Sequence, residues 1–125
     1  MVFMRGRSMK NITLGSTGIT VPQNAFGALP IQRISAQDAA GLLKKAYEGG
    51  MRFFDTARAY SDSEEKMGLG LADVREQIYI ASKTAAKTPE GFWKDLETTL
   101  TNLKTDYLDI YQLILHIFLK SHFRL

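Results

Sequence analysis

The sequence predicts an α/β protein in which strands and helices alternate, and three observations support this fold class. Apolar, strand-like segments begin near residues 24, 52, 77 and 108, so a similar unit recurs every 25 to 31 residues. Helical patterns fill the gaps between these segments. The chain has 125 residues and is 45% hydrophobic, which is sufficient for a core. Such a repeat predicts parallel strands joined by right-handed crossovers.

The first elements are predicted from turn and capping residues. Residues 12–21 place β-branched residues on both sides of a Gly/Ser/Thr turn, which predicts a β-hairpin. A short buried strand is expected at residues 24–29. Ser35 as N-cap and Asp38 as its capping-box partner then predict the start of a helix, which Gly49-Gly50 ends.

A second strand is expected at residues 52–55, followed by a helix that Ser61 or Asp62 caps. In this helix we expect an outward face of Glu64, Glu65 and Lys66 and an inward face of Met67 and Leu71. Gly68 and Gly70 weaken the helix, and we interpret them as positions of close packing.

The third strand is expected at residues 77–82 and the fourth at residues 107–113. The helix between them is predicted by Thr88 as N-cap and Pro89 at the first helical position, where a missing N–H has no cost. Leucine and phenylalanine at helical spacing give this helix one apolar face, and they are Phe92, Leu96, Leu100 and Leu103.

Two architectures fit parallel βα units, an open doubly wound sheet and a (β/α)8 barrel. A doubly wound nucleotide binder needs a glycine-rich loop after its first strand. That position is Gly27-Ala28-Leu29-Pro30, without the required glycines, so the barrel of the TIM type is favoured. Such barrels have about 250 residues and eight strands. We therefore expect about four βα units, a half-barrel, preceded by the N-terminal hairpin, which in a barrel could cover the bottom.

Composition excludes several classes of protein. The sequence has no cysteine, so a disulfide framework and thiolate metal sites are excluded, and no metal site is expected. The net charge is +3, but part of the basic excess lies near the ends and no basic stripe with aromatics occurs, so no nucleic-acid partner is expected. No segment resembles a signal peptide or a membrane span. A cytoplasmic protein without membrane partners is therefore expected.

Three residues at the ends of the second and third predicted strands suggest acid–base chemistry. Asp55 ends one strand, Tyr60 lies in the loop after it, and Lys83 ends the next strand. In a barrel these ends meet at one mouth, where active sites lie. A tyrosine hydroxyl is a weak acid; a nearby ammonium favours its ionised form, and a carboxylate holds that ammonium in place. Such a trio suits protonation of an alkoxide formed from a carbonyl, with the hydride coming from a reduced nicotinamide.

Each residue alone has a simpler structural explanation. An aspartate at a strand end is often a helix cap, a single tyrosine usually packs at the surface, and a lysine after a strand usually points to water. Their joint placement at adjacent strand ends brings the catalytic interpretation level with the structural one.

The same residues belong to a longer pattern that closely resembles the aldo-keto reductase family. The matching segments are Arg52-Phe53-Phe54-Asp55-Thr56-Ala57 with Tyr60, Ser63-Glu64 with Gly68, Ile80-Ala81-Ser82-Lys83, the hairpin at residues 14–21 and the strand approach at residues 100–113. The resemblance covers residues 10–113. It implies the N-terminal half of a (β/α)8 barrel that reduces an aldehyde or ketone, a small carbonyl substrate, with NADPH.

The resemblance also implies roles for single residues. Tyr60 would be the catalytic proton donor, and Asp55 and Lys83 would be the catalytic partners that adjust its acidity. Gly27 and Ala28, together with Asp55, would lie near the nicotinamide. Most of the site for the rest of NADPH would lie in the C-terminal half of such a barrel.

The pattern departs from the family after Leu113, where a histidine that orients the carbonyl is expected. The chain has Ile114 there, and His116 lies two residues on, about 6.6 Å further along a strand. We therefore predict a leader or added remnant at residues 1–9, the half-barrel at 10–113 and a divergent apolar tail at 114–125. Two functions follow: a truncated carbonyl reductase, or an inactive half-barrel that forms a homo-oligomer through its exposed strand edges.

Overall fold

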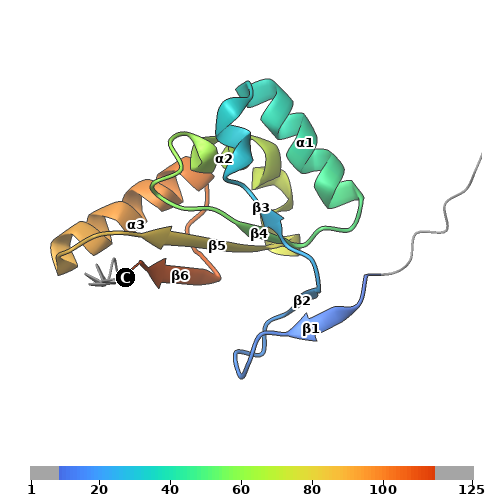
Figure 1. The fold of residues 1–125 in the computed structure, drawn as a ribbon, viewed down its shortest axis with the longest axis horizontal. Coiled ribbons are helices and arrows are strands. Elements are labelled where there is room, and N and C mark those ends of the chain that lie inside the picture. The colour runs from blue at the N-terminus through green and yellow to red at the C-terminus, as the bar shows by residue number, and fades with distance from the viewer. Residues whose placement is uncertain (1–8, 115–125) are drawn as a thin grey trace, which may run out of the picture.

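The computed structural model describes residues 9–114, and its elements follow the predicted βα order (Figure 1). The strands are β1 (Asn11–Thr13), β2 (Thr20–Pro22), β3 (Phe26–Gly27), β4 (Phe53–Asp55), β5 (Tyr79–Thr84) and β6 (Ile110–Leu113). The α-helices are α1 (Ala36–Glu48), α2 (Ser63–Leu71) and α3 (Pro89–Leu103), and the 3-10 helices are η1 (Pro30–Arg33) and η2 (Ala72–Gln77).

Four of these strands form one parallel sheet in the order β3-β4-β5-β6. Gly27 pairs with Asp55, Asp55 with Ala81, and Ala81 with Ile110, so one row crosses the whole sheet. Because the strands are parallel and in sequence order, their carboxyl ends lie at the same edge. The fold therefore brings the loop after β4 next to the end of β5.

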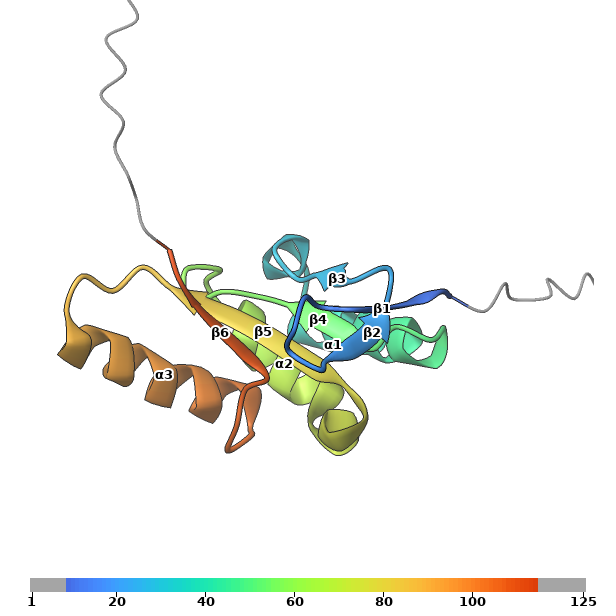
Figure 2. The same ribbon diagram turned by 90° about the horizontal axis from the view of Figure 1, so that it is seen from below.

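The hydrophobic core lies between the sheet and the helices on one of its faces. Phe54 and Ile80 point from the sheet into a cluster with Leu43 of α1, Met67 of α2 and Leu103 of α3. Successive side chains along a strand point to opposite faces of the sheet. Asp55 is one residue from Phe54 and Lys83 is three residues from Ile80, so both side chains lie on the other face. In Figure 1 α1 and α2 lie above the sheet, and Figure 2 shows the sheet from the opposite, helix-free side.

The predicted hairpin is confirmed as the antiparallel pair β1–β2, with Ile12 opposite Val21. It lies on the side of the sheet away from α1 and α2 (Figure 2). A Cβ added to Gly50 would lie 3.1 Å from the terminal methyl group of Met9, so the start of the hairpin contacts the turn before β4. The hairpin thus begins at the amino end of the sheet, the end that it would cover in a barrel.

Two of the three helix starts predicted from capping residues have the expected cap hydrogen bond. The Ser35 hydroxyl oxygen accepts the Asp38 backbone N–H at 3.0 Å, and the same hydroxyl donates to the Asp38 carboxylate at 2.8 Å. Thr88 accepts the Gly91 N–H at 3.0 Å at the start of α3, with Pro89 first in the helix. These caps are local, which is why a sequence pattern finds them.

The predicted outward face of α2 is wrong in part. Glu65 is exposed, but Glu64 and Lys66 are buried, with 1% and 4% of their surface exposed. The reason is that α2 packs against α1 on one side and α3 on the other, which leaves a narrow strip for solvent. Asp62 precedes the helix but makes no side-chain cap hydrogen bond.

The glycines of α2 are the close-packing positions that the sequence predicts. A Cβ at Gly68 would lie 2.2 Å from the carbonyl oxygen of Asn102 at the end of α3. A Cβ at Gly70 would lie 3.0 Å from the Cα of Ala40 in α1. These two glycines let both neighbouring helices approach α2 closely.

The bounds of the predicted strands differ from the observed ones. The strand expected at residues 24–29 covers only Phe26 and Gly27, because η1 begins at Pro30, and the strand expected at residues 52–55 begins at Phe53. The 3-10 helix η2 occupies residues 72–77, so β5 begins later and continues to Thr84, with Lys83 inside the strand. The fourth strand begins at Ile110 rather than at residue 107, because the segment before it carries the turn from α3. Within residues 9–114, no helix has the length and apolar character needed to cross a membrane.

Candidate active site

Lys83 is at the centre of the polar groups at the carboxyl edge of the sheet. Its Nζ donates to both carboxylate oxygens of Asp55, at 2.9 and 2.8 Å, and to the backbone carbonyl of Thr56 at 2.7 Å. An ammonium group has three donors, and these three acceptors match them. The Lys83 side chain is 16% exposed, so the ion pair orients a partly desolvated cation on the open face of the sheet.

Tyr60 lies next to this ion pair. The Nζ of Lys83 is 5.4 Å from the centre of the Tyr60 ring, within the range of a cation–π contact. Backbone hydrogen bonds hold the loop, since the Tyr60 N–H donates to Ala57 at 3.1 Å and its carbonyl accepts the Ser63 N–H at 2.8 Å. The structure therefore brings together Asp55, Tyr60 and Lys83, as the sequence predicts.

The trio has the components of a proton-donating site. A phenol hydroxyl is the acid, the ammonium favours the phenolate that remains after proton transfer, and the carboxylate keeps the ammonium in position. Asp55 and Thr56 accept all three N–H hydrogens of the Lys83 ammonium. While these hydrogen bonds persist, Lys83 acts on the Tyr60 ring through its positive charge and not through a hydrogen bond.

Gly27 and Ala28 lie beside Asp55 but differ in accessibility. Gly27 is exposed, and a Cβ there would meet no atom within 4 Å, so the space above it is open. Ala28 is fully buried in the core; its N–H donates to the Asp55 carbonyl at 2.8 Å and its carbonyl accepts the Ser63 hydroxyl at 2.9 Å. Gly27 therefore has room beside it, whereas Ala28 supports Asp55 and Ser63 from below. The cofactor-binding role of both residues stays a prediction.

A buried carboxylate that sequence reasoning placed in solvent lies directly behind the trio. Glu64 forms an ion pair with Arg58 and accepts hydrogen bonds from Ser82 at 2.9 Å and Thr99 at 2.8 Å. Only indirect features of the sequence point to this carboxylate. Ser82 follows the apolar residues Ile80 and Ala81 and directly precedes Lys83, and Thr99 lies among the leucines of the third helix.

The loop with Tyr60 contains one unusual backbone conformation. Ser61 has φ of +40°, a region that residues other than glycine seldom adopt. Its hydroxyl donates to the Gln32 side chain of η1 at 3.1 Å. This contact joins the loop after β4 to the loop after β3, on either side of the Asp55 position.

The expected histidine position is occupied by Ile114, which continues the ladder next to β5. Its N–H donates to the Thr84 carbonyl at 2.7 Å. His116 and the second histidine of the predicted tail, His122, lie outside the described residues. The same holds for residues 1–8 of the predicted leader and for the tail after Ile114.

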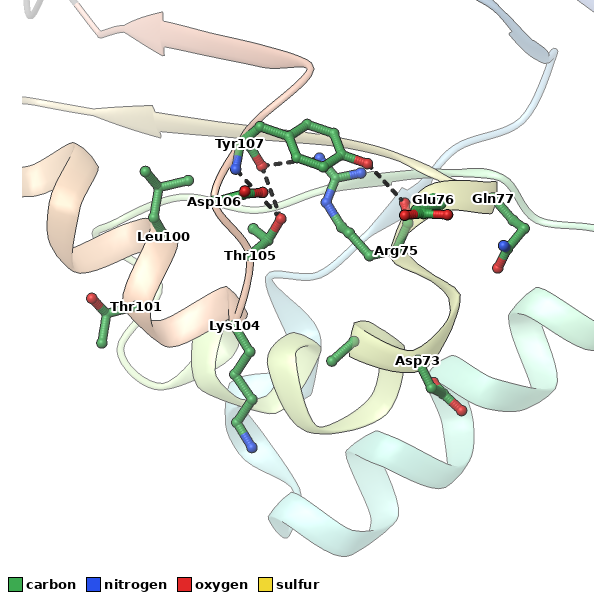
Figure 3. Close-up of a pocket in the computed structure, with 11 residues that line it drawn as sticks. Asp73, Arg75, Glu76, Gln77, Leu100, Thr101, Lys104, Thr105, Asp106 and Tyr107 are labelled. Carbon is green, nitrogen blue, oxygen red and sulfur yellow. Dashed lines mark hydrogen bonds between the residues drawn. The ribbon is translucent and has the colours of Figure 1, made fainter.

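A surface groove of about 660 Å³ lies away from these residues, between η2 and the end of α3 (Figure 3). Arg75 lines it, stacks 3.9 Å from the centre of the Tyr107 ring and pairs with Asp109 at 2.8 Å. Arg75 also donates to Ile78, just before β5, so the groove lies near the amino ends of the strands. The chemistry of the side chains, and not the size of this groove, identifies the candidate site.

Comparisons with known sequences point to one protein family. The sequence model of the Aldo/keto reductase family matches residues 12–120. The chain is 34% identical over 117 residues to an NADPH-dependent codeinone reductase from Papaver somniferum, covering 86% of this chain and 36% of that protein. It is 32% identical over 112 residues to L-galactose dehydrogenase from Arabidopsis thaliana, covering 78% of this chain and 35% of the relative.

Solved structures give the same result at the level of the fold. A putative aldo-keto reductase from Pseudomonas aeruginosa superposes with a TM-score of 0.76 at 29% identity, over 82% of this chain and 46% of that one. The described sheet thus corresponds to half of a (β/α)8 barrel, and the chain spans about a third of the length of the curated relatives. The family match runs seven residues past Leu113, into the predicted tail. The relatives named above are oxidoreductases. The match to the family model, together with the half-barrel fold, shows that this chain belongs to the aldo/keto reductase family.

Proposed function

We propose that this chain carries the proton-donating half of an NADPH-dependent carbonyl reductase active site. The observation that supports this most directly is the ion pair of Lys83 and Asp55 beside the Tyr60 ring. The substrate class is an aldehyde or ketone, because protonation of the carbonyl oxygen is the step that this trio can perform.

In this reaction Tyr60 transfers its hydroxyl proton to the oxygen of the substrate carbonyl as that oxygen gains negative charge. Lys83 stabilises the phenolate left on Tyr60, because its ammonium lies on the same side of the sheet. Asp55 holds the Lys83 ammonium in place by two hydrogen bonds. Bulk solvent then returns a proton to Tyr60, whose loop is at the surface.

NADPH, when bound, supplies the hydride that no side chain can provide. The residues at the strand ends fit a nicotinamide ring, since Gly27 has open space above it and is the direct neighbour of Asp55. The codeinone reductase relative is NADPH-dependent, which supports this cofactor.

The test is NADPH oxidation by the purified chain with a panel of aldehydes and ketones, with Tyr60→Phe as the matched control. The control removes one oxygen atom and keeps the ring against Lys83. We expect carbonyl-dependent oxidation that Tyr60→Phe reduces by at least about 100-fold. Turnover equal to that of Tyr60→Phe would refute reductase activity for this chain and leave its family membership intact.

A second candidate function, self-association of the half-barrel, is supported by the strand edges. Among the described residues, β3 and β6 each have one neighbour in the sheet, and Leu113 of β6 is 48% exposed. A twofold axis along the strands would place β6 of one copy beside β3 of another in parallel orientation. Light scattering over a range of concentrations tests it: a mass of two chains supports ring closure, and a stable monomer contradicts it.

A further inference from the structure

Glu64 is a buried charged residue that the proposed proton transfer does not use. Its Oε1 accepts hydroxyl hydrogen bonds from Ser82 of β5 and Thr99 of α3, and its Oε2 pairs with Arg58 and lies 3.4 Å from the side-chain amide of Asn102. Burying a carboxylate costs free energy unless it is fully paired, and here four partners from three parts of the chain pair it. A side chain with so many fixed partners has little freedom to move.

Two of these partners are next to the catalytic candidates. Arg58 lies between Asp55 and Tyr60, and its backbone N–H donates to the Lys83 carbonyl at 2.9 Å. Ser82 immediately precedes Lys83 in β5. Glu64 is thus connected by side-chain contacts to the loop with Tyr60 and to the strand with Lys83.

We propose that Glu64 is a positioning residue for this site. From the core it holds Arg58, and through Arg58 the loop of residues 56–62, against the end of β5. It thereby sets the separation of the Tyr60 ring from the Lys83 ammonium. The meaning of that separation for catalysis rests on the proposed function, but the positioning itself is measurable without turnover.

The chain offers a matched control in Asp109. This carboxylate is also mostly buried, pairs with Arg75 at 2.8 Å and accepts the Ile80 N–H at 2.8 Å. It lies near the amino ends of the strands, away from Tyr60. Replacing either carboxylate by its amide removes one charge from a buried ion pair and weakens the fold, but only the Glu64 change reaches the loop.

The experiment is residue-resolved amide hydrogen exchange of the wild-type chain, Glu64→Gln and Asp109→Asn, each corrected for its own global stability by denaturant unfolding. The amides to follow are those of Thr56 and Arg58, which donate to the Ala81 and Lys83 carbonyls. In Glu64→Gln we expect these amides to exchange at least about tenfold faster than global unfolding explains. In Asp109→Asn we expect the same amides to exchange at the rate that global unfolding explains. If the ratio of the observed rate to that expected rate is the same in both variants, the proposal is overturned.

Arg58→Met keeps the experiment decisive if Glu64→Gln does not fold, because Glu64 then retains its hydroxyl partners. It should accelerate exchange at Thr56 in the same way, and unchanged exchange there would also overturn the proposal.

A kinetic comparison separates this proposal from the proposed function. If the wild-type chain turns over, Glu64→Gln should lower kcat about tenfold and leave the KM for NADPH within about twofold. If the wild-type chain is inactive, the proposed function fails while the exchange result stands.

Discussion

At the scale of single residues, the site depends on how polar side chains are shared between the two faces of the sheet. Asp55 and Lys83 form their ion pair on the open face, and Ser82, next to Lys83, points to the helices and reaches Glu64. This alternation lets one strand end carry both a candidate catalytic lysine and the contact that supports it.

The ion pair of Asp62 and Lys66 predicts a pH dependence of stability. The hydrogen bond from Lys66, at 2.9 Å, lowers the pKa of Asp62 below its usual value of 3.8. A carboxylate whose pKa is lower in the folded state contributes stability above its unfolded pKa, and this contribution is lost as the pH falls through the folded pKa.

We therefore expect Asp62→Asn to be less stable than wild type at pH 7, with a difference that shrinks once the pH falls below about 4. Urea unfolding at pH 7 and pH 3 measures it. Asp106→Asn is the control, because Asp106 is exposed and forms no ion pair among the described residues. A difference that is constant with pH would show that the Asp62 charge is not responsible.

At the scale of elements, α2 is the helix on which the half-barrel depends, since it packs between α1 and α3. Gly68→Ala should lower the free energy of unfolding by about 2–3 kcal/mol, because the added Cβ would lie 2.2 Å from the Asn102 carbonyl oxygen. Gly41→Ala in α1, where a Cβ meets nothing within 4 Å, should raise it by about 0.5–1 kcal/mol. Denaturant unfolding of both variants is the measurement, and equal effects would contradict the packing described for α2.

Elements defined by local signals could be predicted from the sequence, and burial caused by neighbouring elements could not. The Ser35 and Thr88 caps and the hairpin depend on residues close in the chain, and all three are confirmed. Glu64 and Lys66 were expected in solvent because their helix alone has no reason to bury them. Their partners Ser82, Thr99 and the Ile31 carbonyl come from other elements, so only the assembled fold reveals them.

The same distinction applies to the candidate site. Asp55, Tyr60 and Lys83 could be predicted because parallel strand ends must meet at one edge, whatever the details of packing. The end of β5 was misplaced by two residues, since η2 delays the strand, but the side chain of Lys83 still reaches Asp55. The sequence pattern does not single out Arg58, because its structural role comes from the ion pair with the buried Glu64.

At the scale of the whole molecule, the described chain is half of a barrel with an open sheet face at which the candidate site lies. The sheet holds Asp55 and Lys83 without any residue from a second half, since their contacts come from β4, β5 and the loop between β4 and α2. The trio of Asp55, Tyr60 and Lys83 is thus complete within one half-barrel, whereas Ile114 stands at the position expected for the histidine that orients the carbonyl.

The most direct test of the central claim, that Lys83 and its partners form a reductase site, is carbonyl-dependent NADPH oxidation by wild type, Lys83→Met and Lys44→Met. Lys44 is an exposed lysine of α1, so its variant controls for the loss of one positive charge. We predict turnover by the wild type and Lys44→Met, and a loss of at least about 100-fold in Lys83→Met. Equal rates in all three chains, or no turnover in any of them, would contradict the claim.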